Sequence, residues 1–147
     1  KKTVFLSLME IEKKWTLSVI MRTNSIAKKN QVIQTKLEKV LSYTKQTMVA
    51  YLGEEDLNRL CTYVAEYSIG DTLQKISPVK VDPQLKSIDI IHFGWNIGKA
   101  FDRKRIHTAT FIKNVFAHTL SDLKISTIER KMSHTESECR IKLDRNI

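Results

Sequence analysis

IHFGWNIGKAF, residues 91–101, is the segment on which the fold depends, because it gathers two glycines, a tryptophan and two phenylalanines in one apolar run. Gly94 and Gly98 share a helical face, where their missing side chains allow another helix to approach closely. The run lacks the GK[ST] ending of a phosphate loop. We therefore predict a core helix, in which Trp95 is a large buried anchor and His92 is a packing residue.

Upstream of this run, the sequence predicts where the core helix begins. Asp82 followed by Pro83 is the pairing expected of an N-cap and a first helical residue. The segment SPVKVDPQ contains both prolines of the chain. The residue before each proline is disfavoured in the helical conformation. We therefore expect a linker at residues 78–83 that separates two parts of the protein.

Downstream, the pattern is typical of a tri-helical helix-turn-helix unit over residues 84–133. DRKRIHT is a polar break, TATFIKNVFAHTL predicts a helix over 108–120, and SDLKI predicts a short turn. Ser126 and Glu129 have the spacing of a capping box, which predicts a last helix to about Ser133. In such units the last helix enters the major groove of DNA.

The candidate DNA-binding residues of this unit are cationic or hydroxyl side chains. Arg can pair with guanine, while hydroxyls and first-turn amides can hold phosphate. The residues are Arg103, Lys104, Arg105, Lys113, Ser126, Thr127, Arg130 and Lys131.

A second basic group precedes this unit. Lys28, Lys36 and Lys39 fall on one arc of an expected long helix, as a strip that follows DNA phosphates requires. The solvated face of a dimer-forming helix has the same pattern, so both interpretations stay open.

Residues 1–77 are expected to form a helical part that self-associates. Apolar spacing predicts a helix to about residue 22, with Phe5, Leu8, Met9, Glu12 and Trp15 on its inner face. RTNSIAKKN, residues 22–30, predicts a break in which Asn24 or Ser25 caps the next helix. That helix stops at Gly53, and a third, with acids in its first turn, stops at Gly70.

Residues 134–147 form a polar tail without helical periodicity. The sequence leaves open whether this tail is ordered. CRIKL, residues 139–143, is compatible with one short strand.

One resemblance concerns the segment that runs from IIHFGWNIGKAF through FIKNVF to ISTIERKM. It resembles the C-terminal part of regulators carried on conjugative transposons of gut anaerobes, in the order of an apolar helix, an aromatic-ended helix and a polar basic segment. It covers about a third of the chain and shares no specific motif. The resemblance implies a DNA-binding regulator, and the sequence identifies no family.

The composition narrows the classes of protein. The 147 residues include 25 Lys and Arg against 16 Asp and Glu, a net charge of +9, which fits a polyanionic partner or plain solubility. Cys61 and Cys139 are far apart without a CxxC motif, so no disulfide framework or zinc site is indicated. No run suits a membrane span, and no catalytic pattern is recognisable. We expect a cytoplasmic, non-enzymatic protein without cofactor or metal.

Together these patterns predict an all-α protein that binds double-stranded DNA, as a homodimer, and regulates transcription. The alternative is a non-enzymatic helical module that binds a protein partner and no nucleic acid.

Overall fold

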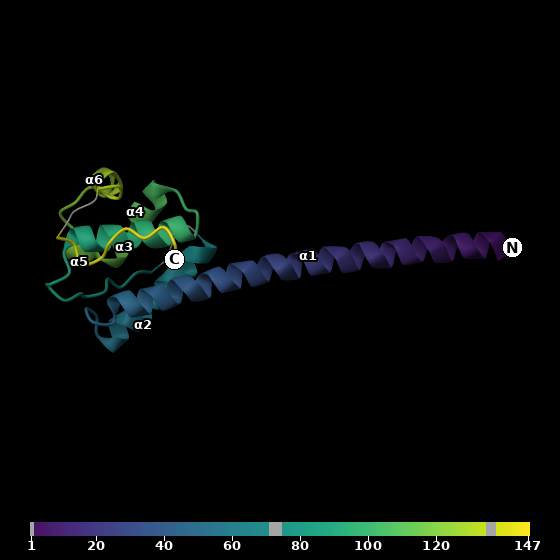
Figure 1. Ribbon diagram of the computed structural model, residues 1–147, viewed down its shortest axis with the longest axis horizontal. Helices are drawn as coiled ribbons and strands as arrows, with labels where there is room; N and C mark the ends of the chain where they lie inside the picture. Colours follow the sequence, from purple (N-terminus) through teal and green to yellow (C-terminus); the bar gives the residue numbers. More distant parts are fainter. Residues whose placement is uncertain (1, 71–74, 135–137) are drawn as a thin grey trace. The chain divides into compact units, whose positions relative to one another are not determined.

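The computed structural model contains six α-helices and no strand among the residues that it describes, which are 2–70, 75–134 and 138–147 (Figure 1). In residues 2–12, 14 and 15 only the backbone is described. The all-α class predicted from the sequence is confirmed. The helices are α1 (Lys2–Met48), α2 (Glu54–Ile69), α3 (Ser87–Ala100), α4 (Arg105–Val115), α5 (Ala117–Leu120) and α6 (Ile125–Lys131).

Helix α1 continues through residues 22–30, where the sequence predicted a break. This segment has neither glycine nor proline, and its Ala, Lys and Arg residues favour helix, so polarity alone does not end it. The Thr23 hydroxyl donates to the Val19 carbonyl oxygen at 2.9 Å, so it is satisfied within the helix. The predicted break is therefore wrong, and neither Asn24 nor Ser25 caps a helix.

The chain separates into two compact units, residues 1–35 and residues 36–147. The first unit holds the greater part of α1, and the inner face predicted from Phe5 to Trp15 lies outside the described side chains. The predicted linker at residues 78–83 has no helix and belongs to the second unit.

Helix α2 begins after Gly53 and ends before Gly70, as the sequence predicted. The Gly70 N–H donates to the Glu66 carbonyl oxygen at 3.0 Å. The Tyr63 hydroxyl accepts the N–H of Ser77 at 2.9 Å, which holds the following loop against the helix. The buried face of α2 consists of Leu60, Tyr63, Val64 and Tyr67.

Helix α3 begins at Ser87, one turn later than the predicted start at Pro83. The Asp82 carboxylate accepts the N–H two residues further on at 2.8 Å, so it forms a local turn instead of a helix cap. At the observed start, the Asp89 carboxylate accepts the N–H of Lys86 at 2.9 Å.

Helix α3 lies in the core of the second unit, as predicted for residues 91–101. A Cβ atom on Gly94 would lie 2.7 Å from Cδ1 of Ile112, and one on Gly98 would lie 2.4 Å from Oγ1 of Thr108. Helix α4 therefore approaches α3 where the two glycines leave room. The close approach predicted from their spacing is confirmed.

Helix α4 begins at Arg105 and ends at Val115, although the sequence predicted one helix over 108–120. The Val115 carbonyl oxygen accepts the N–H of Val79 at 2.9 Å, a bond from a distant loop that takes the place of an intrahelical one. The chain turns and restarts as α5 at Ala117.

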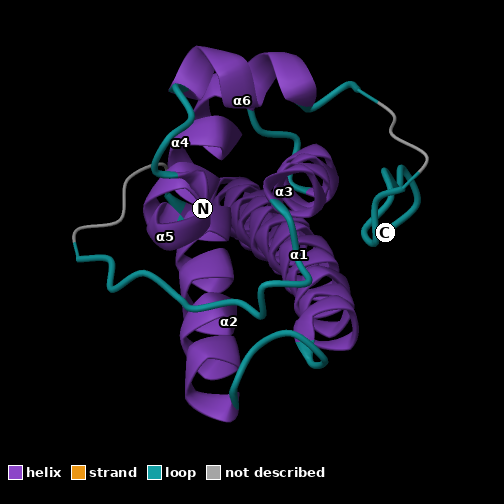
Figure 2. Ribbon diagram, turned by 90° about the vertical axis from the view of Figure 1, so that its left-hand side faces the viewer, coloured by secondary structure: helices purple, strands orange, loops and turns teal. Residues whose placement is uncertain are grey.

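Helix α6 begins at Ile125, and no side chain caps it, so the predicted Ser126–Glu129 capping box is wrong. Helix α4 packs against both α3 and α6, so the three helices of the expected tri-helical unit are in contact (Figure 2). The helix-turn-helix arrangement itself stays a prediction.

Residues 139–143, CRIKL, do not form the strand that the sequence allowed. Backbone groups of residues 140–142 bond instead to Asp89, His92 and Asn96 on α3. A backbone paired in this way is not available to a neighbouring strand. The described part of the tail, 138–147, is therefore held against α3.

Candidate nucleic-acid interface

The loop between α3 and α4 positions three of the predicted basic residues. Asp102 has a φ of 56°, in the left-handed region that Asp tolerates better than most residues. The Arg103 N–H donates to the Gly98 carbonyl oxygen at 2.8 Å, which closes a tight reversal of the chain. Lys104 and Arg105 follow directly and open α4.

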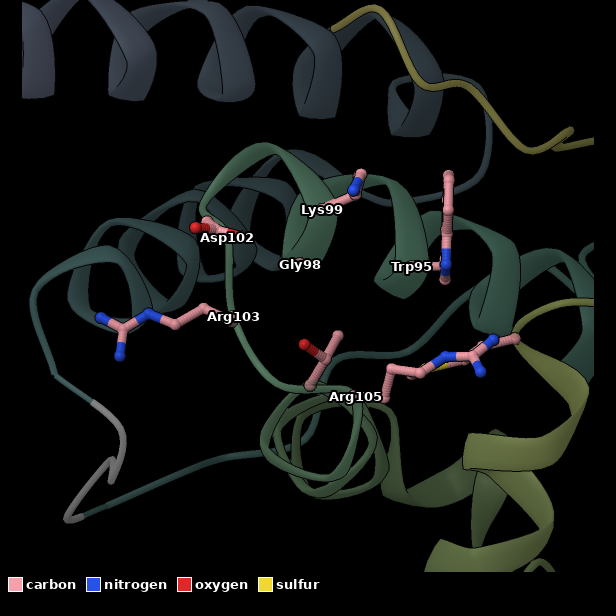
Figure 3. Close-up of a pocket in the computed structure, with 8 residues that line it drawn as sticks. Trp95, Gly98, Lys99, Asp102, Arg103 and Arg105 are labelled. Atoms are coloured by element: carbon pink, nitrogen blue, oxygen red, sulfur yellow. The ribbon is translucent and has the colours of Figure 1, made fainter.

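Arg103 has a structural role in this loop. Its guanidinium donates to the carbonyl oxygens of Tyr67 at 3.2 Å and Ser68 at 3.1 Å, and it lies 5.5 Å from the centre of the Tyr67 ring. Figure 3 shows its side chain directed away from Trp95 and Arg105. Arg103 therefore joins the loop to α2, and its half-buried guanidinium is already bonded to main-chain acceptors.

A pocket of about 230 Å³ lies between the end of α3 and the start of α4 (Figure 3). The pocket is lined by Trp95, Gly98 and Lys99 of α3, by Arg105 of α4, and by Met132, which is the residue that follows α6. Trp95 packs against the core, as predicted, but it is only half-buried. Its indole ring forms one wall of the pocket.

Cationic residues that line this pocket or lie next to a lining residue in the sequence form what we call the basic surface. Met132 follows the last turn of α6 and lines the same pocket as Arg105 at the start of α4, so these two helix ends lie close together. None of these cations makes an ion pair with a described carboxylate. The basic surface consists of Lys99 and Arg105, which line the pocket, and of Lys104, Arg130 and Lys131, each within two positions of a lining residue.

The other predicted residues of this unit lie away from the pocket. Lys113 is in the last turn of α4, about 12 Å along the helix from Arg105. Ser126 and Thr127 are in the first turn of α6, at the opposite end from its basic residues, with Ser126 exposed and Thr127 half-buried. The two ends of α6 therefore present different chemistry.

The basic strip predicted on α1 is divided between the two units. Lys28 belongs to the first unit, and Lys36 and Lys39 belong to the second. All three side chains are exposed.

The sequence reasoning missed a polar row on α3. Asp89, His92 and Asn96 lie on one face of this apolar helix, and their exposed fractions are 1%, 0% and 1%. The signal was present, because three polar residues at positions i, i+3 and i+7 share a helical face. Their partners were not recognisable, because these lie 42 to 52 positions later in the chain.

Two members of the row bond to the main chain of the C-terminal segment. The Asp89 carboxylate accepts the N–H groups of Arg140 at 2.6 Å and Ile141 at 3.1 Å. The His92 Nδ1 atom lies 2.8 Å from the carbonyl oxygen of Ile141, and Nε2 lies 2.7 Å from that of His134.

Asn96 joins the C-terminal segment to the end of α1. Its amide donates to the Lys142 carbonyl oxygen at 2.8 Å and to the Tyr43 hydroxyl at 2.7 Å, and its Oδ1 accepts the N–H of Asp144 at 2.7 Å. Burial raises the pKa of Tyr43, the hydrogen bonds from Asn96 and Thr47 oppose this increase, and the charge of Asp144 adds to it.

Metal and nucleophile chemistry find little support in the described part of the chain. There, no three His, Cys, Asp or Glu side chains come together as metal ligands. Burial raises the pKa of the Cys61 thiol, and Lys45 opposes the increase, so this thiol is not an activated nucleophile. Within the same residues, every helix is too short or too polar to span a bilayer.

No protein-family model, curated protein or solved structure matches the chain. Function must therefore be inferred from the geometry.

Proposed function

We propose that this protein binds double-stranded DNA through the basic surface. The observation that supports this proposal is that Lys99 and Arg105 line one pocket, with Lys104 and the basic end of α6 next to lining residues in the sequence, and that none of these cations pairs with a described carboxylate. Cations of this kind can neutralise DNA phosphates, and the release of condensed counterions then favours binding.

Phosphate contacts position a protein on DNA, whereas base contacts give it sequence preference. The sequence predicts that α6 enters the groove, with Arg130 able to pair with guanine and the Ser126 and Thr127 hydroxyls able to hold phosphate, but α6 spans only Ile125–Lys131, about 10 Å along its axis. We therefore propose that backbone contacts from the basic surface supply most of the affinity, and that groove contacts from the start of α6 are secondary.

Fluorescence anisotropy with a random-sequence duplex at several salt concentrations tests this proposal. The test variant is Lys104→Ala with Arg105→Ala. The control, Lys45→Ala with Lys80→Ala, removes two exposed cations that do not line the pocket. Each lost phosphate contact lowers the slope of log affinity against log salt by about 0.9.

We expect weaker binding and a slope reduced by about 2 in the test variant, and wild-type behaviour in the control. Equal losses in both variants would mean that total charge, and not the basic surface, determines binding. If a further variant, Arg130→Ala with Lys131→Ala, bound DNA with full affinity, α6 would not be part of the DNA interface. No binding at about 50 mM salt would exclude DNA as the partner.

A second candidate function is self-association through α1. Val19, Ile26 and Ile33 repeat at the heptad interval, and β-branched residues at that position favour two-stranded coiled coils. A second copy of the chain is the proposed partner, because parallel copies bring identical rows into register. The large apolar side chains of this region that are about half exposed or more are Leu17, Val19, Ile20, Met21, Ile26, Val32 and Ile33.

Charge limits the strength of this pairing. Arg22 and Lys29 lie three positions after Val19 and Ile26, where a coiled coil usually has apolar residues. The like charges of two copies repel each other, and salt screens this repulsion. We therefore expect a weak dimer that becomes stronger as the salt concentration rises, in contrast to DNA binding.

Sedimentation velocity over a range of protein and salt concentrations tests the dimer. Ile26→Gln with Ile33→Gln removes apolar groups from an exposed row, and Asn24→Gln with Asn30→Gln is the matched control. The first variant should be monomeric where the wild type and the control are dimeric. A wild type that is monomeric under all conditions would reject self-association.

A further inference from the structure

We infer that the pocket beside Trp95 captures one unpaired nucleobase of the bound nucleic acid, an inference that rests on the DNA binding proposed above. The Trp95 ring lines the pocket, and cationic side chains stand beside it (Figure 3). Proteins hold unpaired bases by stacking them on aromatic rings within a positively charged groove. Trp95 and the basic surface supply both parts of such a site.

The interior of the pocket is suited to a flat apolar face. Gly98 lines the pocket one helical turn from Trp95 and adds no side chain to it, and the Thr108 side chain packs directly on this glycine. The Thr108 hydroxyl is engaged with the Tyr67 hydroxyl at 2.7 Å and the Lys104 carbonyl oxygen at 3.2 Å, so it does not need a ligand.

The rim carries the polar groups that a nucleotide requires. Lys99 and Arg105 are exposed, and each can donate to a phosphate oxygen. Asp102 is exposed and makes no ion pair with a described cation, so its carboxylate can accept an N–H from the edge of a base. Figure 3 shows Arg105 extending toward Trp95, which places a cation beside the stacking surface.

The size of the pocket favours a single base. Its volume of about 230 Å³ lies below the roughly 300–1,000 Å³ of sites that enclose drug-sized ligands. A base within a duplex must first be unstacked and unpaired, and this cost is smallest at a mismatch. The protein should therefore prefer a duplex that contains unpaired bases over a fully paired duplex with the same number of phosphates.

Anisotropy with two labelled duplexes of equal length tests this preference. One duplex is fully paired and the other has two adjacent mismatches, so their phosphate charge is identical. We expect the wild type to bind the mismatched duplex about tenfold more tightly, a typical effect of one stacked base. Trp95→Leu should abolish the preference while keeping the affinity for paired DNA, and Trp95→Tyr should restore most of it. Equal wild-type affinity for both duplexes would overturn the inference and leave DNA binding intact.

A second measurement keeps Trp95 in place, so it does not depend on the folding of a Trp95 variant. It also distinguishes binding of a base within DNA from binding of a free nucleotide. Trp15→Phe leaves Trp95 as the only tryptophan. Stacking should then quench its fluorescence when the mismatched duplex, and not the paired duplex, is added. Quenching by a nucleoside monophosphate in a protein that binds no duplex would overturn both proposals and assign the pocket to a free nucleotide. If neither duplex nor the nucleoside monophosphate quenches the Trp95 fluorescence, the inference is overturned.

Discussion

Three buried polar side chains of α3 determine how the C-terminal segment lies on this helix. Asp89, His92 and Asn96 pair with main-chain groups at particular positions, and each would cost free energy if it were buried without a partner. Ile141 adds an apolar contact, with 5% of its surface exposed. The hydrogen bonds therefore determine the register of the segment, and Ile141 contributes burial.

Gly98→Ala should lower the free energy of unfolding by roughly 1–3 kcal/mol, because the added Cβ meets the stiff Thr108 side chain. This cost exceeds the gain of up to about 1 kcal/mol in helix propensity. Urea unfolding measures the change. Gly70→Ala is the control, because a Cβ there has no atom within 4 Å, and its effect should stay within about 0.5 kcal/mol. Equal effects at both glycines would contradict the close approach of α4.

Tyr43 should make stability fall in alkaline solution. Because burial raises its pKa above the ordinary 10.0, the folded protein favours the protonated phenol. The contribution of Tyr43 to the free energy of unfolding is complete below about pH 10, and it is lost as the pH rises through the folded-state pKa. Urea unfolding between about pH 8 and about pH 11 should show a steeper loss in the wild type than in Tyr43→Phe. Parallel losses would show that Tyr43 does not titrate in this way.

Some of these residue environments could be predicted from the sequence and others could not. The glycine spacing indicated a close helix neighbour, because that signal is local. The partial exposure of Trp95 at a pocket that Met132 also lines depends on tertiary packing, which the spacing within α3 does not reveal. The basic residues were recognisable one by one, but the meeting of Lys99 and Arg105 at one pocket results from the packing of α4 against α3.

The helices follow local signals except where a tertiary contact or a missing breaker overrides them. Helix α2 matches its prediction because acids begin it and Gly70 follows its end. The interruption at Phe116 was not predictable, because the bond to the Val115 carbonyl oxygen comes from Val79. The predicted break within α1 relied on polar composition, which does not prevent helix formation.

Ser25→Pro tests the continuity of α1. Proline in a helix interior removes a hydrogen bond and clashes with the preceding turn, at a cost of about 3 kcal/mol. We expect a measurable loss of ellipticity at 222 nm, whereas Ser25→Ala should keep or raise the helix signal. An unchanged signal in the proline variant would support the break predicted from the sequence and contradict the continuous helix.

Across the 147 residues, the two units differ in composition and burial. Residues 1–35 include seven Lys and Arg and two Glu, and their described side chains are exposed. Every buried side chain that the structure describes lies in the second unit, from Val40 onward. The second unit therefore contains its own core, and the first offers exposed apolar and cationic groups.

Deletion of residues 1–35 should change the free energy of unfolding by less than about 0.5 kcal/mol, because it removes no described buried side chain. Urea unfolding of residues 36–147 and of the 147-residue chain measures the difference. Deletion to residue 48 should be strongly destabilising, because it also removes the buried Val40, Thr44 and Met48. A large loss from the shorter deletion would contradict an independent second unit.

The polar row of α3 also has a consequence for synthesis on the ribosome. Asp89, His92 and Asn96 are translated well before residues 140–144, which supply their main-chain partners. Until those residues leave the exit tunnel, part of the hydrogen-bonding capacity of these three side chains can be satisfied only by water, so α3 cannot be fully buried. Final packing of the second unit should therefore wait for residues 140–144, and a chain arrested before residue 138 should bind chaperones that recognise incompletely folded domains.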